Sequence, residues 1–348
     1  MNFKKIIFIN FLIFFFIILV LEISFGYWLK KESFGFYMQK HRNKNEYYEV
    51  FSKNQKQLVK YKRNFYGFRG NEIDDLSKIK IVFVGGSTGN ERFLNEKDTI
   101  VGRLNYLLYK NSYKSKIYNA SIDGKTTQGY INDFKFWFSK LKGFNPDVFI
   151  FYTGINDSVL NQPLKHDELY SNKKYFQIKD YIVNNSITIE LLKKIQDKYF
   201  IKIKLEYDLT KNSNQLYSKN YSYFNYNKAI KNYNLQNLKN KHSYLKLRFE
   251  KRLNDLLPYI YNYNSIPIFI TQVRYDGLMD EQLFLVNELL KEFCKKNNIY
   301  IIKLDEIYNT NKKDFYDSIH TTAQGSDSIS KIMYDELLKI NKNKKIIF

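Results

Sequence analysis

The stretch KIVFVGGST at residues 80–88 decides the fold class of this chain. It is a short apolar run that ends in two glycines, as is typical of a strand buried on both faces of a parallel sheet. Similar runs recur at residues 116–119, 147–152, 267–273 and 300–304. Helical patterns occupy residues 99–109, 130–141, 280–297 and 322–340. This alternation predicts a three-layer α/β/α domain of flavodoxin-like kind, with a parallel sheet between helices. The last helix is expected to begin at a capping box of Thr321 with Gln324.

An apolar run at residues 6–28 precedes this domain. It matches the roughly 20 residues that a helix needs to cross a bilayer, and Tyr27 and Trp28 lie where an aromatic belt would meet the headgroups. A cleaved signal peptide is the alternative, but the run is longer than a signal core of roughly 7–15 residues. We therefore expect an uncleaved single-pass anchor over residues 1–30. Basic residues flank the run on both sides, so charge leaves the orientation open.

The remainder of the chain divides into parts of different composition. Residues 31–65 are expected to be a juxtamembrane linker, and residues 66–343 the α/β domain. Within that domain, residues 164–240 are rich in Asn, Tyr and Lys and are interpreted as an insertion, partly helical and without a clean strand. It could fold over the site as a lid, with the tyrosines at 221–226 stacking on sugar rings, although aromatic residues in such a composition are more often ordinary packing.

The formal net charge of +21 invites comparison with nucleic-acid-binding proteins. Lysines are scattered and outnumber arginines, with no arginine stripe, so no nucleic-acid partner is expected. Attraction to anionic lipid or to acidic polysaccharide fits the charge equally well. The single Cys294 lies on the apolar face of a predicted helix and is expected to be structural. The histidines at 41, 166 and 242 stand alone in the sequence, so neither a metal nor another cofactor is expected.

Three polar motifs follow predicted strands, at the edge where open α/β sheets place their sites. GGST sets Ser87 just after a strand, where the start of the next helix offers N–H groups to an oxyanion. GIND contains Asn156, whose amide can donate a hydrogen bond to developing negative charge. DSIH places Asp317 three residues before His320, so the carboxylate can hold Nδ1–H while Nε2 faces a nucleophile. Each motif alone is more often an ordinary turn, but a nucleophile, an amide donor and an Asp/His pair in this order favour a catalytic site.

Taken together, the motifs resemble the sequence blocks of the SGNH (GDSL-like) serine hydrolases. GGST resembles the first block, NASIDG ending at Gly124 the second, GIND the third and DSIH the last. The resemblance implies a triad in which Ser87 is the nucleophile, His320 the general base and Asp317 its orienting carboxylate. It also implies an oxyanion hole made by the backbone N–H groups of Ser87 and Gly124 and the side chain of Asn156.

The resemblance covers about residues 80–340, apart from the insertion, and it departs from the familiar signature. Gly86 and Thr88 stand where that signature has Asp and Leu. This variant, with NFYGFRG at residues 64–70, resembles membrane-anchored bacterial members that act at the cell envelope.

The resemblance implies a membrane-anchored esterase that removes O-acyl groups, expected to be O-acetyl groups, from cell-surface carbohydrate. Its domain would lie on the extracytoplasmic or periplasmic side. Two alternatives stay open. One is an O-acyltransferase with the same triad, which would need a multi-spanning partner or an external acyl donor. The other is a catalytically silent carbohydrate-binding or assembly protein.

Overall fold

The computed structural model describes residues 3–28, 37–38, 41–52, 55–158, 174–199, 205–208, 230–274, 281–309 and 311–344. Its central sheet has the strand order β4-β3-β5-β7-β8, with every neighbouring pair parallel. The strands are β3 (Ile81–Gly85), β4 (Ile117–Asn119), β5 (Val148–Tyr152), β7 (Ile266–Ile270) and β8 (Tyr300–Ile302). In chain order this is the 2-1-3-4-5 arrangement of flavodoxin-like folds, which confirms the predicted fold class.

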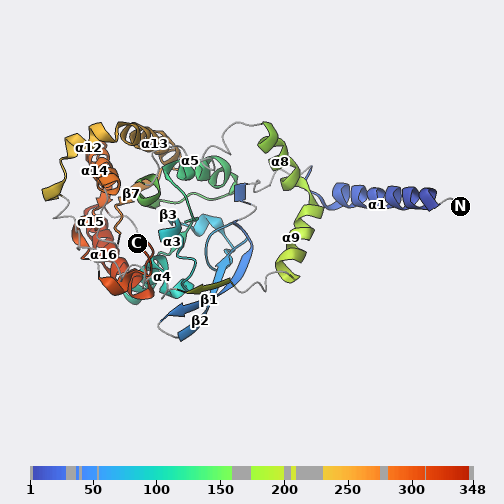
Figure 1. Cartoon of the computed structure of the whole chain (residues 1–348), viewed down its shortest axis with the longest axis horizontal. Coiled ribbons are helices and arrows are strands. Elements are labelled where there is room, and N and C mark those ends of the chain that lie inside the picture. The colour runs from blue at the N-terminus through green and yellow to red at the C-terminus, as the bar shows by residue number, and fades with distance from the viewer. Residues whose placement is uncertain are drawn as a thin grey trace.

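Helices cover both faces of this sheet (Figure 1). The alternation of side chains along β5 shows why two cores form: Phe149 and Phe151 pack into one, whereas Ile150 and Tyr152 pack into the other. The first core is covered by α5 (Thr127–Phe136), α12 (Leu235–Lys241), α13 (Ser243–Tyr261) and α14 (Glu281–Lys296). The second is covered by α4 (Ile100–Lys110) and α16 (Ala323–Lys344).

Several helical details differ from the sequence-based expectation. The helix expected over 130–141 starts earlier and ends at Phe136, and a separate 3-10 turn, η3 (Phe138–Lys140), follows it. Helix α13 was not predicted. Cys294 is fully buried on α14, as expected. The short elements are η1 (Leu76–Lys78), α3 (Ser87–Asn90), η2 (Glu96–Asp98), α6 (Ile155–Ser158), α15 (Leu304–Ile307) and η4 (Lys312–Asp314).

The start of α16 corrects the predicted capping box. Gly325 N donates to Thr322 Oγ1 at 3.3 Å, so Thr322 caps this helix. The Thr321 hydroxyl instead donates to Glu91 Oε1 at 2.8 Å. The Gln324 side chain donates to Asp314 Oδ1 at 3.2 Å. The Thr321 hydroxyl is therefore hydrogen-bonded to Glu91, the residue that caps the end of the short helix α3 beginning at Ser87.

A second, three-stranded sheet has the order β2-β1-β6. Strands β1 (Lys44–Ser52) and β2 (Gln55–Arg63) are antiparallel, and β6 (Leu205–Asp208) runs parallel to β1. The hairpin occupies much of the segment 31–65 that was expected to be a linker, and β6 is a strand inside the expected insertion. Tyr48 and Val50 of β1 and Val59 and Tyr61 of β2 are buried in one cluster, but the Lys and Glu residues between them hide this pattern in the sequence.

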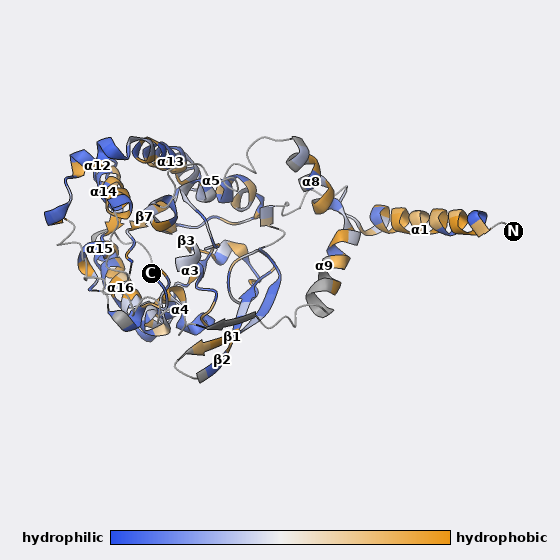
Figure 2. Cartoon of the chain, viewed as in Figure 1, coloured by the Kyte–Doolittle hydropathy of each residue, from blue (hydrophilic) through white to orange (hydrophobic). Residues whose placement is uncertain are grey.

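Helix α1 (Phe3–Phe25) is long and apolar enough to cross a membrane, and none of its residues is buried (Figure 2). A membrane anchor and a signal sequence both meet this description. Helices α8 (Lys174–Asn185) and α9 (Ile187–Tyr199), from the expected insertion, lie at the carboxyl end of α1. The tyrosines at 221–226, expected in a lid, fall outside the described residues.

Candidate active site

Ser87 lies where the sheet topology predicts a site. Strand order reverses between β3 and β5, and Ser87 follows the carboxyl end of β3 as the first residue of α3. A Cβ added at the preceding Gly86 would lie 2.3 Å from Asn156 Nδ2, so a side chain here would require the Asn156 amide to move.

The loop before α16 brings an imidazole and a carboxylate to this serine. His320 Nε2 lies 2.8 Å from Ser87 Oγ, and its Nδ1 lies 2.7 Å from Asp317 Oδ2. The other Asp317 oxygen accepts the backbone N–H groups of Ile319 and His320, at 2.9 and 2.7 Å. Although burial opposes the shift, these hydrogen bonds and the imidazole lower the pKa of Asp317. The ring of Tyr316 stacks on His320, with 5.6 Å between centroids.

The second and third motifs also reach the nucleophile turn. Asn156 follows β5 in α6, and its Nδ2 donates to the Lys125 carbonyl at 2.7 Å. That carbonyl and the Asn156 amide both lie against Gly86. Gly124 has φ +74°, in the left-handed region that favours glycine. The structure therefore brings Ser87, His320, Asp317 and Asn156 together, and Gly124 precedes the residue whose carbonyl Asn156 contacts. The oxyanion-hole roles of Gly124 and Asn156 stay predictions.

A buried ion pair holds the segment after Gly124. The Lys125 ammonium contacts the Asp133 carboxylate, which also accepts the hydroxyl of Tyr37 at 2.7 Å. Burial lowers the pKa of Lys125 to about 8 even with this carboxylate beside it. Removing one partner of such a pair leaves an uncompensated buried charge and costs about 3–5 kcal/mol. Lys125, whose carbonyl accepts the Asn156 amide, is thus held in place by a buried ion pair.

Glu91 is a site residue that sequence reasoning missed. It is fully buried at the end of α3, with φ +46°. Its carboxylate accepts the N–H of Ile100 at 2.6 Å and the hydroxyls of Thr321 and Ser326. Burial raises the pKa of Glu91 to about 7 against these donors. Glu91 therefore ties the nucleophile helix to the residue that follows His320, and no local sequence pattern indicates such a contact.

Gln272 is a second missed residue, just beyond the carboxyl end of β7. Its Nε2 donates to Thr88 Oγ1 at 2.8 Å, and its Oε1 accepts the N–H of Ile155 at 2.7 Å. Gln272 thus joins the nucleophile turn to the Asn156 turn. The contact also accounts for Thr88, where the familiar signature has leucine, because a leucine would leave the buried amide without this acceptor. The apolar run predicted at residues 267–273 includes Gln272, whereas β7 ends at Ile270, so the sequence carries no signal that this side chain lies beyond the strand.

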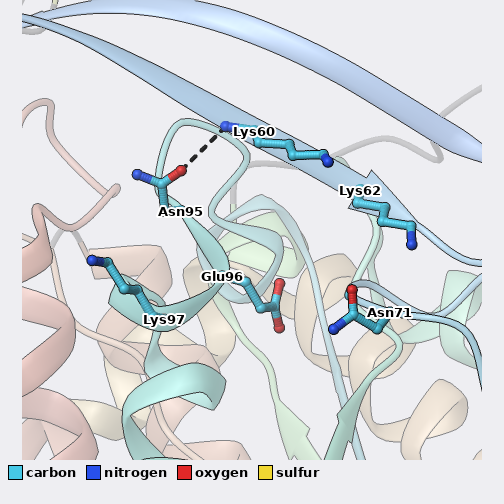
Figure 3. Close-up of a pocket in the computed structure, with 7 residues that line it drawn as sticks. Lys60, Lys62, Asn71, Asn95, Glu96 and Lys97 are labelled. Atoms are coloured by element: carbon cyan, nitrogen blue, oxygen red, sulfur yellow. Dashed lines mark hydrogen bonds between the residues drawn. The ribbon is translucent and has the colours of Figure 1, made fainter.

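A pocket of about 500 Å³ lies between β2 and the segment around η2 (Figure 3). The carboxylate of Glu96 pairs there with Arg69 at 2.9 Å, so the surrounding lysines give the pocket a net positive charge. Its lining residues are Lys60, Lys62, Gly70, Asn71, Asn95, Glu96 and Lys97. An acidic group on a ligand would fit this charge. The lining includes none of the predicted site residues.

His41 and His242, two of the three histidines that stand alone in the sequence, have partners of other kinds. His242 Nε2 lies 3.2 Å from Glu281, and the His41 carbonyl accepts Arg63 Nε at 2.9 Å. His166 falls outside the described residues. Within the described ranges, no three His, Cys, Asp or Glu side chains converge as metal ligands.

No protein-family model and no curated protein sequence matches the chain. Solved structures with a similar arrangement include TesA, with 10% identity, a TM-score of 0.45 and coverage of 75% of this chain and 99% of that one. A lipase/acylhydrolase from Enterococcus faecalis has 13% identity, a TM-score of 0.44 and coverage of 75% and 96%. The acetyl xylan esterase AlAXEase has 12% identity, a TM-score of 0.41 and coverage of 74% and 98%. Another similar structure is described as a G-D-S-L family member from Veillonella parvula.

Proposed function

We propose that this chain is a serine esterase that hydrolyses O-acyl esters with Ser87, His320 and Asp317 as its triad. The observation that carries the proposal is the unbroken line of hydrogen bonds from Ser87 Oγ through the imidazole to Asp317. A purely structural turn has no need of a hydroxyl, an imidazole and a carboxylate in this alignment. The same residues would be expected in a transferase, whereas a silent binding protein has no need for them.

The reaction follows from the positions of these atoms. Ser87 Oγ attacks the ester carbonyl carbon while His320 Nε2 takes its proton, and Asp317 stabilises the imidazolium. The tetrahedral oxyanion would accept hydrogen bonds from the Ser87 and Gly124 N–H groups and from the Asn156 amide. Its collapse returns the proton to the leaving alcohol and leaves an acyl-Ser87. Water, deprotonated by His320, then releases the acid and restores the serine.

Carbohydrate bearing O-acetyl groups is the substrate class that we propose. The basic pocket beside β2 supports a glycan with acidic groups, because its three lysines outnumber its single carboxylate. An O-acyltransferase is the second candidate. A single apolar helix cannot carry an acyl donor across a bilayer, so that reading requires a multi-spanning partner or an external donor.

Hydrolysis and transfer differ in the acceptor of the acyl group. We expect the purified full-length chain in detergent to release free acetate from an acetylated glycan, or from an aryl acetate, in water alone. Acetate and acetylated acceptors would be quantified with and without an added sugar alcohol. If the acetyl group appears only on the added hydroxyl and never as free acetate, the hydrolase reading is wrong and the transferase replaces it.

The proposed substrate requires that α1 be an anchor and that the α/β domain face the envelope. The apolar surface of α1 supports the anchor. We expect added protease to digest the domain in intact spheroplasts. A cytoplasmic protein of known location, monitored in the same sample, reports on lysis. Protection of the domain until the cells are lysed would contradict the outward orientation.

A further inference from the structure

Helices α8 and α9 carry apolar side chains that the rest of the described chain does not cover. On α8, Ile178 is 60% and Ile182 is 44% exposed, and their spacing of four residues places them on one face. On α9, Leu191, Leu192 and Ile195 are 44%, 61% and 49% exposed. Leu191 and Ile195 again lie four residues apart. Exposed apolar groups concentrated in this way mark a surface that contacts a partner or a membrane.

A carboxylate from α1 joins these helices to the apolar span. Glu22 lies three residues before the end of α1, and its oxygens accept Ser186 Oγ at 2.6 Å, Thr188 N at 3.0 Å and Ile187 N at 3.2 Å. These groups lie at the start of α9, where the positive end of the helix dipole stabilises a negative charge. The indole of Trp28 donates to the same carboxylate at 2.9 Å. The single acidic residue of α1 therefore accepts the first N–H groups of α9.

The bend between α8 and α9 lies at the level where α1 would leave the bilayer. Asn185 O accepts the N–H of Tyr27 at 2.8 Å, and the ring of Tyr181 packs edge-on against Trp28 with 5.7 Å between centroids. Aromatic residues such as Tyr27 and Trp28 prefer the headgroup region. In Figure 1, α8 and α9 cross the end of α1 and do not continue along its axis. A bilayer crossed by α1 would therefore have these two helices at its surface.

We propose that α8 and α9 form an interfacial membrane-binding element, defined by residues 174–199, whose apolar faces enter the boundary between headgroups and acyl chains. The proposal rests on the proposed role of α1 as an anchor. Lipid is the occupant that we infer, because the bend between α8 and α9 is held against the carboxyl end of α1, the end at which α1 would leave the bilayer. The element would fix the orientation of the α/β domain relative to the membrane.

Fluorescence from lipid-facing positions tests the proposal. Full-length protein carrying one introduced cysteine would be labelled with an environment-sensitive dye and placed in vesicles of phosphatidylcholine and phosphatidylglycerol containing bromolipids. Cys294 should not compete, because burial raises the pKa of its thiol to about 12. We expect Leu192→Cys to report a depth of about 5–10 Å below the headgroups, the position of an interfacial helix. Leu247→Cys on α13, at a leucine that is 64% exposed, is the matched control and should show no quenching by the bromolipids.

Two further variants separate the possible outcomes. Ile13→Cys on α1 reports whether the span itself is inserted. If Ile13 is quenched while Leu192 behaves like Leu247, the interfacial proposal is overturned, the anchor stands and a protein becomes the candidate occupant. If Ile13 is not quenched, the anchor fails and the proposal falls with it. Glu22→Ala should abolish most of the quenching at Leu192 without changing that at Ile13, whereas equal quenching at Leu192 would show that Glu22 does not hold the element in place.

Discussion

Replacing Ser87 with alanine is expected to lower kcat on an aryl acetate by about 10⁶-fold, the loss seen when one member of a Ser-His-Asp unit is removed. The reason is that Ser87 Oγ lies 2.8 Å from His320 Nε2, and no other hydroxyl of the described residues is hydrogen-bonded to this imidazole. The same variant should no longer react with a fluorophosphonate probe. Labelling would be measured by in-gel fluorescence on purified protein, and activity by release of the aryl alcohol.

Two controls sharpen this test. Ser318→Ala changes a half-buried serine in the same loop as His320 and should keep both labelling and activity. His320→Ala should also abolish labelling, and the double variant Ser87→Ala/His320→Ala should be no slower than either single variant, because the two residues act as a unit. Equal labelling of the wild type and Ser87→Ala would end the triad assignment.

Asn156→Ala is expected to reduce kcat by about 10²–10³-fold with little change in KM, the usual consequence of losing one oxyanion donor. The amide of Asn156 lies against Gly86 and is positioned by the Lys125 carbonyl. Its contribution should be realised in the transition state, where the carbonyl oxygen becomes negative. Steady-state kinetics on an aryl acetate would measure both constants.

Stability must be separated from catalysis in this variant. Losing the 2.7 Å bond to the Lys125 carbonyl should itself cost about 1 kcal/mol of unfolding free energy. Asn254→Ala removes a comparable bond, from its amide to the Glu250 carbonyl at 2.8 Å, on the exposed side of α13. It should leave kcat unchanged. Unchanged turnover of a folded Asn156→Ala protein would show that Asn156 is only a turn residue.

Local sequence was sufficient for the main sheet and for the residues of the candidate triad. Strands buried on both faces are continuous apolar runs, so β3 and β5 are visible without any knowledge of their neighbours. Their parallel alternation with helices brings their carboxyl ends to one edge, and this is why Ser87 and Asn156 could be predicted to meet. Asp317 and His320 are close in sequence, so their contact needs only one turn of chain.

Other features were invisible because they depend on partners distant in sequence. The hairpin of β1 and β2 has a half-polar pattern, and its burial depends on what packs against one face. Gln272 and Glu91 gain their roles from contacts with Thr88 and Thr321, which the sequence alone does not pair with them. The chemistry of Glu22 likewise changes from an interruption of an apolar run to the cap of α9.

The sequence by itself thus determined the parallel α/β sheet, the apolar amino-terminal helix and the identity of the candidate triad, because each is encoded in contiguous residues. Only the tertiary structure decided that Gly86 lies against the Asn156 amide, that Glu91 and Gln272 brace the nucleophile turn, and that α8 and α9 lie at the end of α1. Those features arise from hydrogen bonds and close approaches between segments far apart in the chain, for which local periodicity carries no signal.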